Sequence, residues 1–286
     1  MKVGLLVEAE EGLDWATWRT TYLAAERLGF ESIWLSDHLQ SPWGTRSGLE
    51  TWTALSVAAA ETRDLVLGPL VSPIMFREPA IVAYMAQSLA ALSGGRFVLG
   101  LGIGWNAEEH AAAGIPFPSA IERSRRLVNT IERLNSNMPI LIGGSGPRAT
   151  LPVAARFAHQ WNMTTASVAD FSRANATLNQ LCRELGRPPT DILRSVACGV
   201  LIGAEAAGLQ AHGQRMREFV PPLAQTADVV GAARDMGWLA GTPEVLVTEL
   251  RALAAAGVER AVLGHYDLEA IDTLELLAEA VLPSLK

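Results

Sequence analysis

Apolar residues gather in short runs along the chain, and these runs alternate with longer stretches whose apolar positions repeat with a helical period. Because the short runs do not alternate between apolar and polar positions, we expect strands buried on both faces of a parallel sheet. The expected strands cover residues 3–8, 32–37, 65–71, 97–102, 139–144, 160–164, 196–203 and 260–265.

The stretches between these strands are amphipathic, as in "DWATWRTTYLAAERLG" and "TPEVLVTELRALAAAG". Several end on a glycine that is typical of a helix C-terminus, at Gly29, Gly94, Gly186 and Gly257. About eight such strand–helix units fit a single (β/α)₈ barrel over residues 1–286 better than an open doubly wound sheet. Residues 204–240 form an irregular insertion after the seventh strand, where we expect a lid or an extra helical layer at the catalytic face.

Composition narrows the choice of partner. The chain is 49% hydrophobic and carries a formal net charge of −7, which gives a large core and argues against attraction to nucleic acid or to an anionic membrane. A small molecule is the expected partner. The two cysteines have no metal-ligand or redox spacing, and the first apolar run is too short for a signal peptide or a membrane span, so we expect a cytoplasmic protein.

The stretch "FVLGLGIGWNAEEH" places Gly100, Gly102 and Gly104 behind an apolar run. A dinucleotide fingerprint has the pattern Gly-x-Gly-x-x-Gly, but the position of its third glycine is here Trp105. The fingerprint also needs an acidic residue at the end of the next strand, and none lies at the required distance. The glycines either let a flat ligand approach the backbone or simply form a tight turn. Glu108, Glu109 and His110, which follow, do not have the spacing of a metal site. We expect them to form the solvated first turn of a helix.

A second glycine segment, Gly143-Gly144-Ser145-Gly146, follows a strand and precedes Pro147, which we expect to open a helix. Free backbone N–H groups at such a junction favour phosphate binding, although a structural turn remains open. No Walker sequence follows.

Polar residues end two of the expected strands. Asp37 and His38 end the second, where the histidine is a candidate for proton transfer and the carboxylate a candidate for orienting it. A helix-capping aspartate with a surface histidine is the alternative. Glu8 ends the first strand as either a pocket wall or a turn residue. Pro69 and Pro73, in the third strand region, suggest a bulge or an unusual peptide bond.

The motifs "SDHLQSPW", "LSGGRFVLGLGIGWNAEEHAAAGIPFP" and "PILIGGSGPRA" together resemble the bacterial-luciferase-like flavin and deazaflavin oxidoreductases in order and spacing. The resemblance covers nearly the whole chain and implies a (β/α)₈ barrel. Asp-His followed by a tryptophan resembles the branch that uses coenzyme F420, a deazaflavin. A homodimer formed through the alanine-rich segments "TALSVAAAE" and "AIVAYMAQSLAAL" is a further implication, although these segments also suit packing on the barrel's own strands.

The resemblance also implies a set of site residues. Asp37 and His38 would be catalytic and would lie beside the deazaflavin ring, with Glu8 and Trp43 on the substrate side. A cis peptide bond is expected at Pro69–Leu70. The remaining cofactor contacts would come from Pro69, Leu70, Ser72, Gly102, Gly104 and Trp105 around the ring, and from Gly143, Gly144, Ser145 and Gly146 at its phosphate.

Two departures from the family pattern bear on the substrate. The sugar-phosphate dehydrogenases of this family have a glutamate where this chain has Trp105, so their proton donor is absent. The segment between Leu134 and Pro139 is also short, which is expected to leave the pocket more open. We therefore expect an F420-dependent oxidoreductase that transfers a hydride to or from an unidentified substrate. The alternatives are an FMN-dependent monooxygenase with a separate reductase, and a barrel that binds a cofactor without turnover.

Overall fold

The computed structural model describes residues 1–41, 48–134, 138–268 and 270–286. The strands are β1 Lys2–Val7, β2 Ser32–Leu35, β3 Val66–Pro69, β4 Ser72–Pro73, β5 Leu99–Gly102, β6 Ile140–Gly143, β7 Gln160–Thr164, β8 Leu193–Ile202, β9 Leu239–Gly241 and β10 Arg260–His265. The helices are α1 Trp15–Leu28, α2 Thr51–Glu61, α3 Pro79–Leu92, α4 Ala107–Ala112, α5 Ala120–Arg133, α6 Leu151–Phe157, α7 Val168–Glu184, α8 Ala206–Phe219, α9 Pro221–Ala224, α10 Val229–Asp235, α11 Pro243–Ala255 and α12 Ile271–Leu276.

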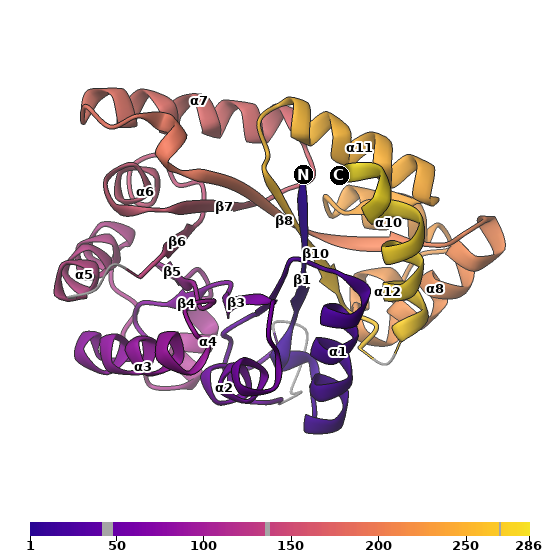
Figure 1. The fold of residues 1–286 in the computed structure, drawn as a ribbon, viewed down its shortest axis with the longest axis horizontal. Helices are drawn as coiled ribbons and strands as arrows, with labels where there is room; N and C mark the ends of the chain where they lie inside the picture. The colour runs from indigo at the N-terminus through magenta and orange to yellow at the C-terminus, as the bar shows by residue number, and fades with distance from the viewer. Residues whose placement is uncertain (42–47, 135–137, 269) are drawn as a thin grey trace.

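The strands form one parallel sheet in the order β3-β2-β1-β10-β8-β7-β6-β5-β4. A parallel bridge between Leu67 of β3 and Phe97, just before β5, links the first strand of this order to the β5–β4 end, so the sheet is nearly closed. The helices surround the ring of strands (Figure 1). The expected (β/α)₈ barrel is confirmed, and every expected strand is present with ends shifted by a few residues.

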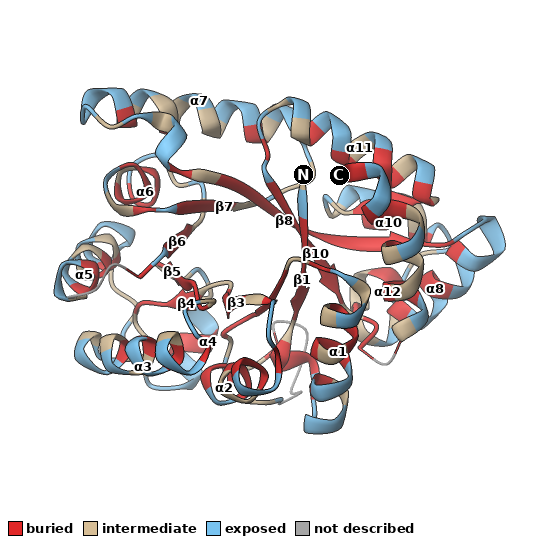
Figure 2. Cartoon of the chain, in the orientation of Figure 1, coloured by how far each residue is buried: buried red, intermediate tan, exposed pale blue. Residues whose placement is uncertain are grey.

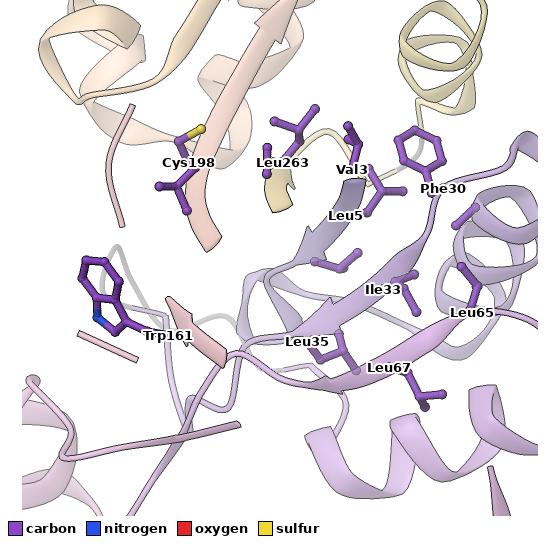
Figure 3. Packing of buried hydrophobic residues seen from close by; sticks show 14 of the residues in the cluster. Val3, Leu5, Phe30, Ile33, Leu35, Leu65, Leu67, Trp161, Cys198 and Leu263 are labelled. Atoms are coloured by element: carbon purple, nitrogen blue, oxygen red, sulfur yellow. The ribbon is translucent and has the colours of Figure 1, made fainter. Parts of the chain in front are cut away.

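Two apolar layers follow from the alternation of side chains along each strand. One layer fills the barrel interior and consists of Leu6, Trp34, Val98, Leu141, Ala197 and Val262. The other lies between the strands and the helices, where Leu5, Ile33 and Leu67 from β1, β2 and β3 belong to one cluster (Figure 3). The strands are accordingly mostly buried, while the outer faces of the helices are exposed (Figure 2). Each large apolar side chain buried in this way contributes about 1.5–3 kcal/mol.

The insertion adds a helical layer beside the carboxyl end of β8, with α8 and α10 at the right of Figure 1. It has its own apolar cluster, which includes Leu209, Met216, Leu223 and Val229. The short strand β9 pairs with the last residues of β8, from Val200 to Ile202. The extra helical layer was predicted, whereas β9 was missed because a three-residue strand carries too little pattern to be recognised.

Of the predictions about the local backbone, those of the helix ends are confirmed, whereas the cis peptide bond and one helix start lie elsewhere. Gly29, Gly94, Gly186 and Gly257 all have a positive φ, which confirms the expected helix ends. The non-proline cis peptide bond lies at Leu70–Val71, one position later than expected. Pro147 does not open a helix, because residues 147–150 form turns and α6 begins only at Leu151. In the part of the chain that the structure describes, no helix has both the length and the apolar character to cross a bilayer.

Candidate functional site at the carboxyl ends of the strands

Strand alternation decides which side chains face the mouth of the barrel. Because Leu6 and Trp34 belong to the interior layer, Glu8 and His38 continue the inward-facing positions of β1 and β2. Tyr266 does the same after Val262 on β10. The three side chains come from neighbouring strands, since β1 pairs with both β2 and β10.

His38 pairs with a carboxylate from α4. Its Nδ1 lies 3.1 and 3.0 Å from the two carboxylate oxygens of Glu109. The same carboxylate accepts the backbone N–H of Leu39 at 2.5 Å. The side chain of His38 is 18% exposed and that of Glu109 only 1%. The carboxylate that orients His38 is therefore Glu109, and not the adjacent Asp37 as the sequence suggested.

The first turn of α4 also differs from the prediction of a solvated turn. Glu108 is exposed, but Glu109 and His110 are buried. The side chain of Asn106 accepts the backbone N–H of Glu109 at 3.1 Å and so caps the helix. The ring of His110 packs between Phe76 and Phe117. The helix lies against the mouth of the barrel, and this tertiary contact removes Glu109 and His110 from water while Glu108 stays exposed.

The His38–Glu109 pair is charged at neutral pH. Burial disfavours the charged ring, but the hydrogen bond to Glu109 and the nearby Glu10 and Glu8 outweigh it and raise the pKa of His38 to about 9. Burial alone would raise the pKa of Glu109, yet its hydrogen bonds with His38 and with the backbone at Leu39 hold that pKa below its ordinary value. His38 therefore places a fixed positive charge at the mouth of the barrel.

Asp37 turns away from His38 and accepts four hydrogen bonds from three side chains. It accepts the Ser72 hydroxyl at 2.5 Å and the Trp52 indole N–H at 3.2 Å. Arg77 donates to both of its oxygens, at 2.6 and 3.0 Å. With Asp37 only 2% exposed, these contacts compensate the buried charge. They fix the end of β2 against β4 and the start of α3.

Glu8 lies opposite Tyr266. The Tyr266 hydroxyl donates to Glu8 at 3.2 Å, and the Tyr266 ring stacks on Trp238 with ring centroids 4.8 Å apart. Burial and the neighbouring Glu10 raise the pKa of Glu8 to about 7, against the opposing effect of His38. Glu10 itself is buried and accepts the Ser36 hydroxyl, and burial raises its pKa as well. Glu8 is therefore able to change its protonation state near neutral pH.

The glycines of β5 and β6 make room for the segment that carries the cis bond. A Cβ at Gly100 would lie 1.9 Å from the carbonyl oxygen of Pro69. A Cβ at Gly102 or Gly143 would lie within 2.8 Å of a Val71 methyl group. At these positions the space is occupied by the protein itself. Gly104 is different, because it has a φ of +76° and a Cβ there would approach the His110 ring.

The other predicted site residues lie around this mouth. Trp105 is 66% exposed, and its ring meets the His38 ring edge-on with centroids 5.7 Å apart. Gly144 has a φ of +116°, and its carbonyl accepts the Trp161 indole N–H at 2.8 Å, while Ser145 beside it is exposed. Trp43 lies outside the described residues. Within the described ranges, no group of three or more His, Cys, Asp or Glu residues has the arrangement of a metal site.

Three residues of this site were not identified from the sequence as site residues: Glu109, Tyr266 and Trp238. Asn106 three positions before Glu109 was the available signal for a capped helix start, but nothing local connects that helix to His38. Tyr266 directly follows a predicted strand, and its inward direction was open to inference from strand alternation. Trp238 lies in the insertion, which has no regular period.

Comparison with known proteins identifies similar chains. Residues 1–138 match the family of luciferase-like monooxygenases. The F420-dependent hydroxymycolic acid dehydrogenase of Mycobacterium tuberculosis is 29% identical over 218 residues, which are 66% of this chain and 59% of that protein. The F420-dependent glucose-6-phosphate dehydrogenase of Intrasporangium calvum is 44% identical over 108 residues, which are 36% of this chain and 32% of that protein. The chain thus spans less than two thirds of either relative.

Solved structures share the fold over the whole chain. The coenzyme F420-dependent tetrahydromethanopterin reductase of Methanopyrus kandleri superposes with a TM-score of 0.79 at 20% identity, and 100% of each chain is covered. At this level of identity the likeness concerns the arrangement of strands and helices, and it agrees with the barrel described above.

Proposed function

Because the chain belongs to the luciferase-like family, we propose that it is an F420-dependent oxidoreductase, which transfers a hydride between the deazaflavin and a small organic substrate. Both relatives reported above carry F420 dependence in their names, which supports this choice of cofactor. We also propose that residues 1–286 form one barrel domain, since β1 and β10 pair along their whole length.

The charged His38–Glu109 pair carries the proposal. Bound F420 would supply the two-electron chemistry, because a deazaflavin moves electrons as a hydride. A ring that accepts a hydride gains negative charge, and a positive group fixed nearby stabilises that charge without reorganisation. With a pKa of about 9, His38 stays protonated at neutral pH and acts through its charge. Ring polarisation by this charge is therefore favoured over the proton transfer expected of His38 from the sequence.

The surroundings of His38 fit a flat cofactor. Leu70 and Val71 are only half-buried and pack against the interior apolar layer, so they offer an apolar support for a ring. Trp105 presents an exposed aromatic surface beside His38. The ring would also be surrounded by Pro69, Ser72, Gly102 and Gly104, of which only some would contact it. Ser72 would act indirectly, through its hydrogen bond to Asp37.

We propose that the segment Gly143–Gly146 holds the phosphate of the cofactor. Gly144 turns the chain with a positive φ after β6, and residues 145–148 are exposed or partly exposed. Without a helix that begins at Pro147, the contribution comes from backbone N–H groups of the turn and not from a helix dipole.

Binding titrations test the proposal. The wild type is titrated with oxidised F420 and separately with FMN, and the same titrations are run on His38→Ala and on Glu108→Gln, an exposed control on α4. We expect micromolar binding of F420, weaker binding in His38→Ala and unchanged binding in the control. Binding of FMN alone would favour the monooxygenase alternative, and binding of neither cofactor would overturn both.

We further propose that a second copy of the chain covers α3. Ile81, Tyr84 and Leu92 on this helix are 55%, 76% and 49% exposed, although the helix is one of the most apolar in the chain. Exposed apolar side chains grouped on one helix are typical of an interface between subunits. The helix lies on the outside of the ring of strands (Figure 1).

A further inference from the structure

An aromatic pair lines the mouth of the barrel above β8 and β10. Trp238, from the insertion, stacks on Tyr266 with an angle of 14° between the ring planes. Two glycines that are register partners, Gly199 and Gly264, make this possible. A Cβ at Gly199 would lie 2.2 Å from the Trp238 indole, and a Cβ at Gly264 would lie 2.9 Å from the Tyr266 ring. Both rings remain partly exposed.

Glu8 lies at the edge of this aromatic pair. It faces inward from β1, accepts the Tyr266 hydroxyl and is partly exposed to the mouth of the barrel. Besides burial, the groups that act on its charge are Glu10 on the turn after β1, His38 and Ser36 after β2, and Tyr266 after β10. Burial and the neighbouring carboxylates, Glu8 first, raise the pKa of Tyr266 well above its ordinary value, so its hydroxyl stays protonated and remains a donor.

The two sides of the mouth thus differ in what they can do. His38 is paired with Glu109 and, with a pKa of about 9, keeps its proton at neutral pH. Glu8 has a pKa of about 7 and its hydrogen-bond donors, Tyr266 and Ser36, are neutral hydroxyl groups, so it can release and regain a proton at neutral pH. Position 105, beside His38, is a tryptophan, which has no acidic proton to exchange.

We propose that Glu8, oriented by Tyr266, exchanges the proton at the oxygen atom of an alcohol or ketone substrate whose apolar body lies on Trp238. The inference rests on the proposed function. In the reducing direction the carbonyl carbon gains a hydride from reduced F420, the C=O π bond breaks, and the oxygen gains the Glu8 proton. The products are the alcohol, oxidised F420 and a Glu8 carboxylate, which regains its proton from water. Alcohol oxidation is the reverse.

The protonation of Glu8 can be followed without any cofactor. The carboxyl carbons of glutamate are labelled with ¹³C, and their NMR shifts are recorded against pH in the wild type, in Glu8→Gln and in the control Glu108→Gln. We expect one resonance with a midpoint near pH 7 that is lost only in Glu8→Gln. Tyr266→Phe should move this midpoint upward, because the lost hydrogen bond favours the charged carboxylate. A Glu8 that titrates near its ordinary value would overturn the inference.

Turnover supplies the second test. Propan-2-ol, butan-2-ol and cyclohexanol are given with oxidised F420, and the matching ketones with reduced F420. We expect kcat to fall about 100-fold or more in Glu8→Gln, with F420 affinity changed less than threefold and with partial activity in Glu8→Asp. In the wild type, alcohol oxidation should rise and ketone reduction should fall as pH increases through 7, since the first needs the carboxylate and the second the acid.

The outcomes separate the two proposals. If the wild type binds F420 but Glu8→Gln keeps its kcat, or if none of these alcohols and ketones reacts, the inference about Glu8 fails while the cofactor assignment stands. If the wild type binds no F420, the proposed function fails and the inference fails with it.

Discussion

The imidazole Nδ1 of His38 lies 3.0 Å from a carboxylate oxygen of Glu109, although 71 residues separate the two in sequence. His38 ends the inward-facing positions of β2, and Glu109 lies on α4, which follows β5. Since β2 and β5 are not neighbours in the sheet, the contact depends on α4 folding across the mouth of the barrel. The pair therefore joins two sides of the barrel and keeps His38 charged.

Replacing Glu109 with glutamine should lower both the pKa of His38 and the stability of the fold. The raised pKa of His38 contributes stability that is complete below about pH 6.5 and is lost as pH rises through about 9. The lowered pKa of Glu109 contributes stability above about pH 4.5, which is lost as pH falls further. We expect Glu109→Gln to cost about 3 kcal/mol between these limits, and less toward pH 9.

Urea unfolding at several pH values measures this difference, and NMR of the His38 ring measures its pKa. Glu132→Gln is a suitable control, because it removes one partner of the exposed Arg156–Glu132 pair and should cost less than about 1 kcal/mol. An unchanged His38 pKa in Glu109→Gln would contradict the electrostatic account of the pair.

Asp37→Asn should destabilise the fold more than it weakens cofactor binding. The substitution neutralises a buried carboxylate that receives two hydrogen bonds from Arg77, and it leaves the guanidinium with only its exposed partner Glu50. We expect a loss of about 3 kcal/mol in the free energy of unfolding. Glu78→Gln, which removes the exposed partner of Arg126, is the control. A large loss of F420 affinity with little loss of stability would instead support the predicted place of Asp37 beside the ring.

The barrel could be predicted from patterns among residues close together in sequence. Apolar runs predicted the strands, and glycines predicted the helix ends. Contacts across the barrel did not follow in this way. Nothing near Glu109 distinguishes a carboxylate that binds His38 from one that faces water. The helix start after Gly146 was placed too early, because Pro147 suits a turn as well as a first helical position.

Tyr84→Glu on α3 should convert a dimer into a monomer. The Tyr84 ring is 76% exposed in the isolated chain, and a charge there would have to be buried against the second copy. Sedimentation velocity over a range of concentrations measures the mass of the particle. Leu185→Glu is the control, because Leu185 is also an exposed apolar residue at 54% but follows α7, on another side of the barrel. A wild type that sediments as a monomer at all concentrations would contradict the proposed interface.

Gly102→Ala should be destabilising, and Val71→Ala should relieve much of that cost. A Cβ at position 102 would lie 2.6 Å from a Val71 methyl group but 3.8 Å from the Val71 Cβ, so removing the methyl groups makes room for it. We expect Gly102→Ala alone to lower the free energy of unfolding by about 2 kcal/mol, and to lower it clearly less in the Val71→Ala background. A double-mutant cycle of urea unfolding measures both values. Gly100→Ala is the control, because its Cβ would meet the backbone carbonyl of Pro69, which Val71→Ala leaves in place. Equal costs for Gly102→Ala in both backgrounds would show that something other than contact with Val71 excludes a side chain at this position.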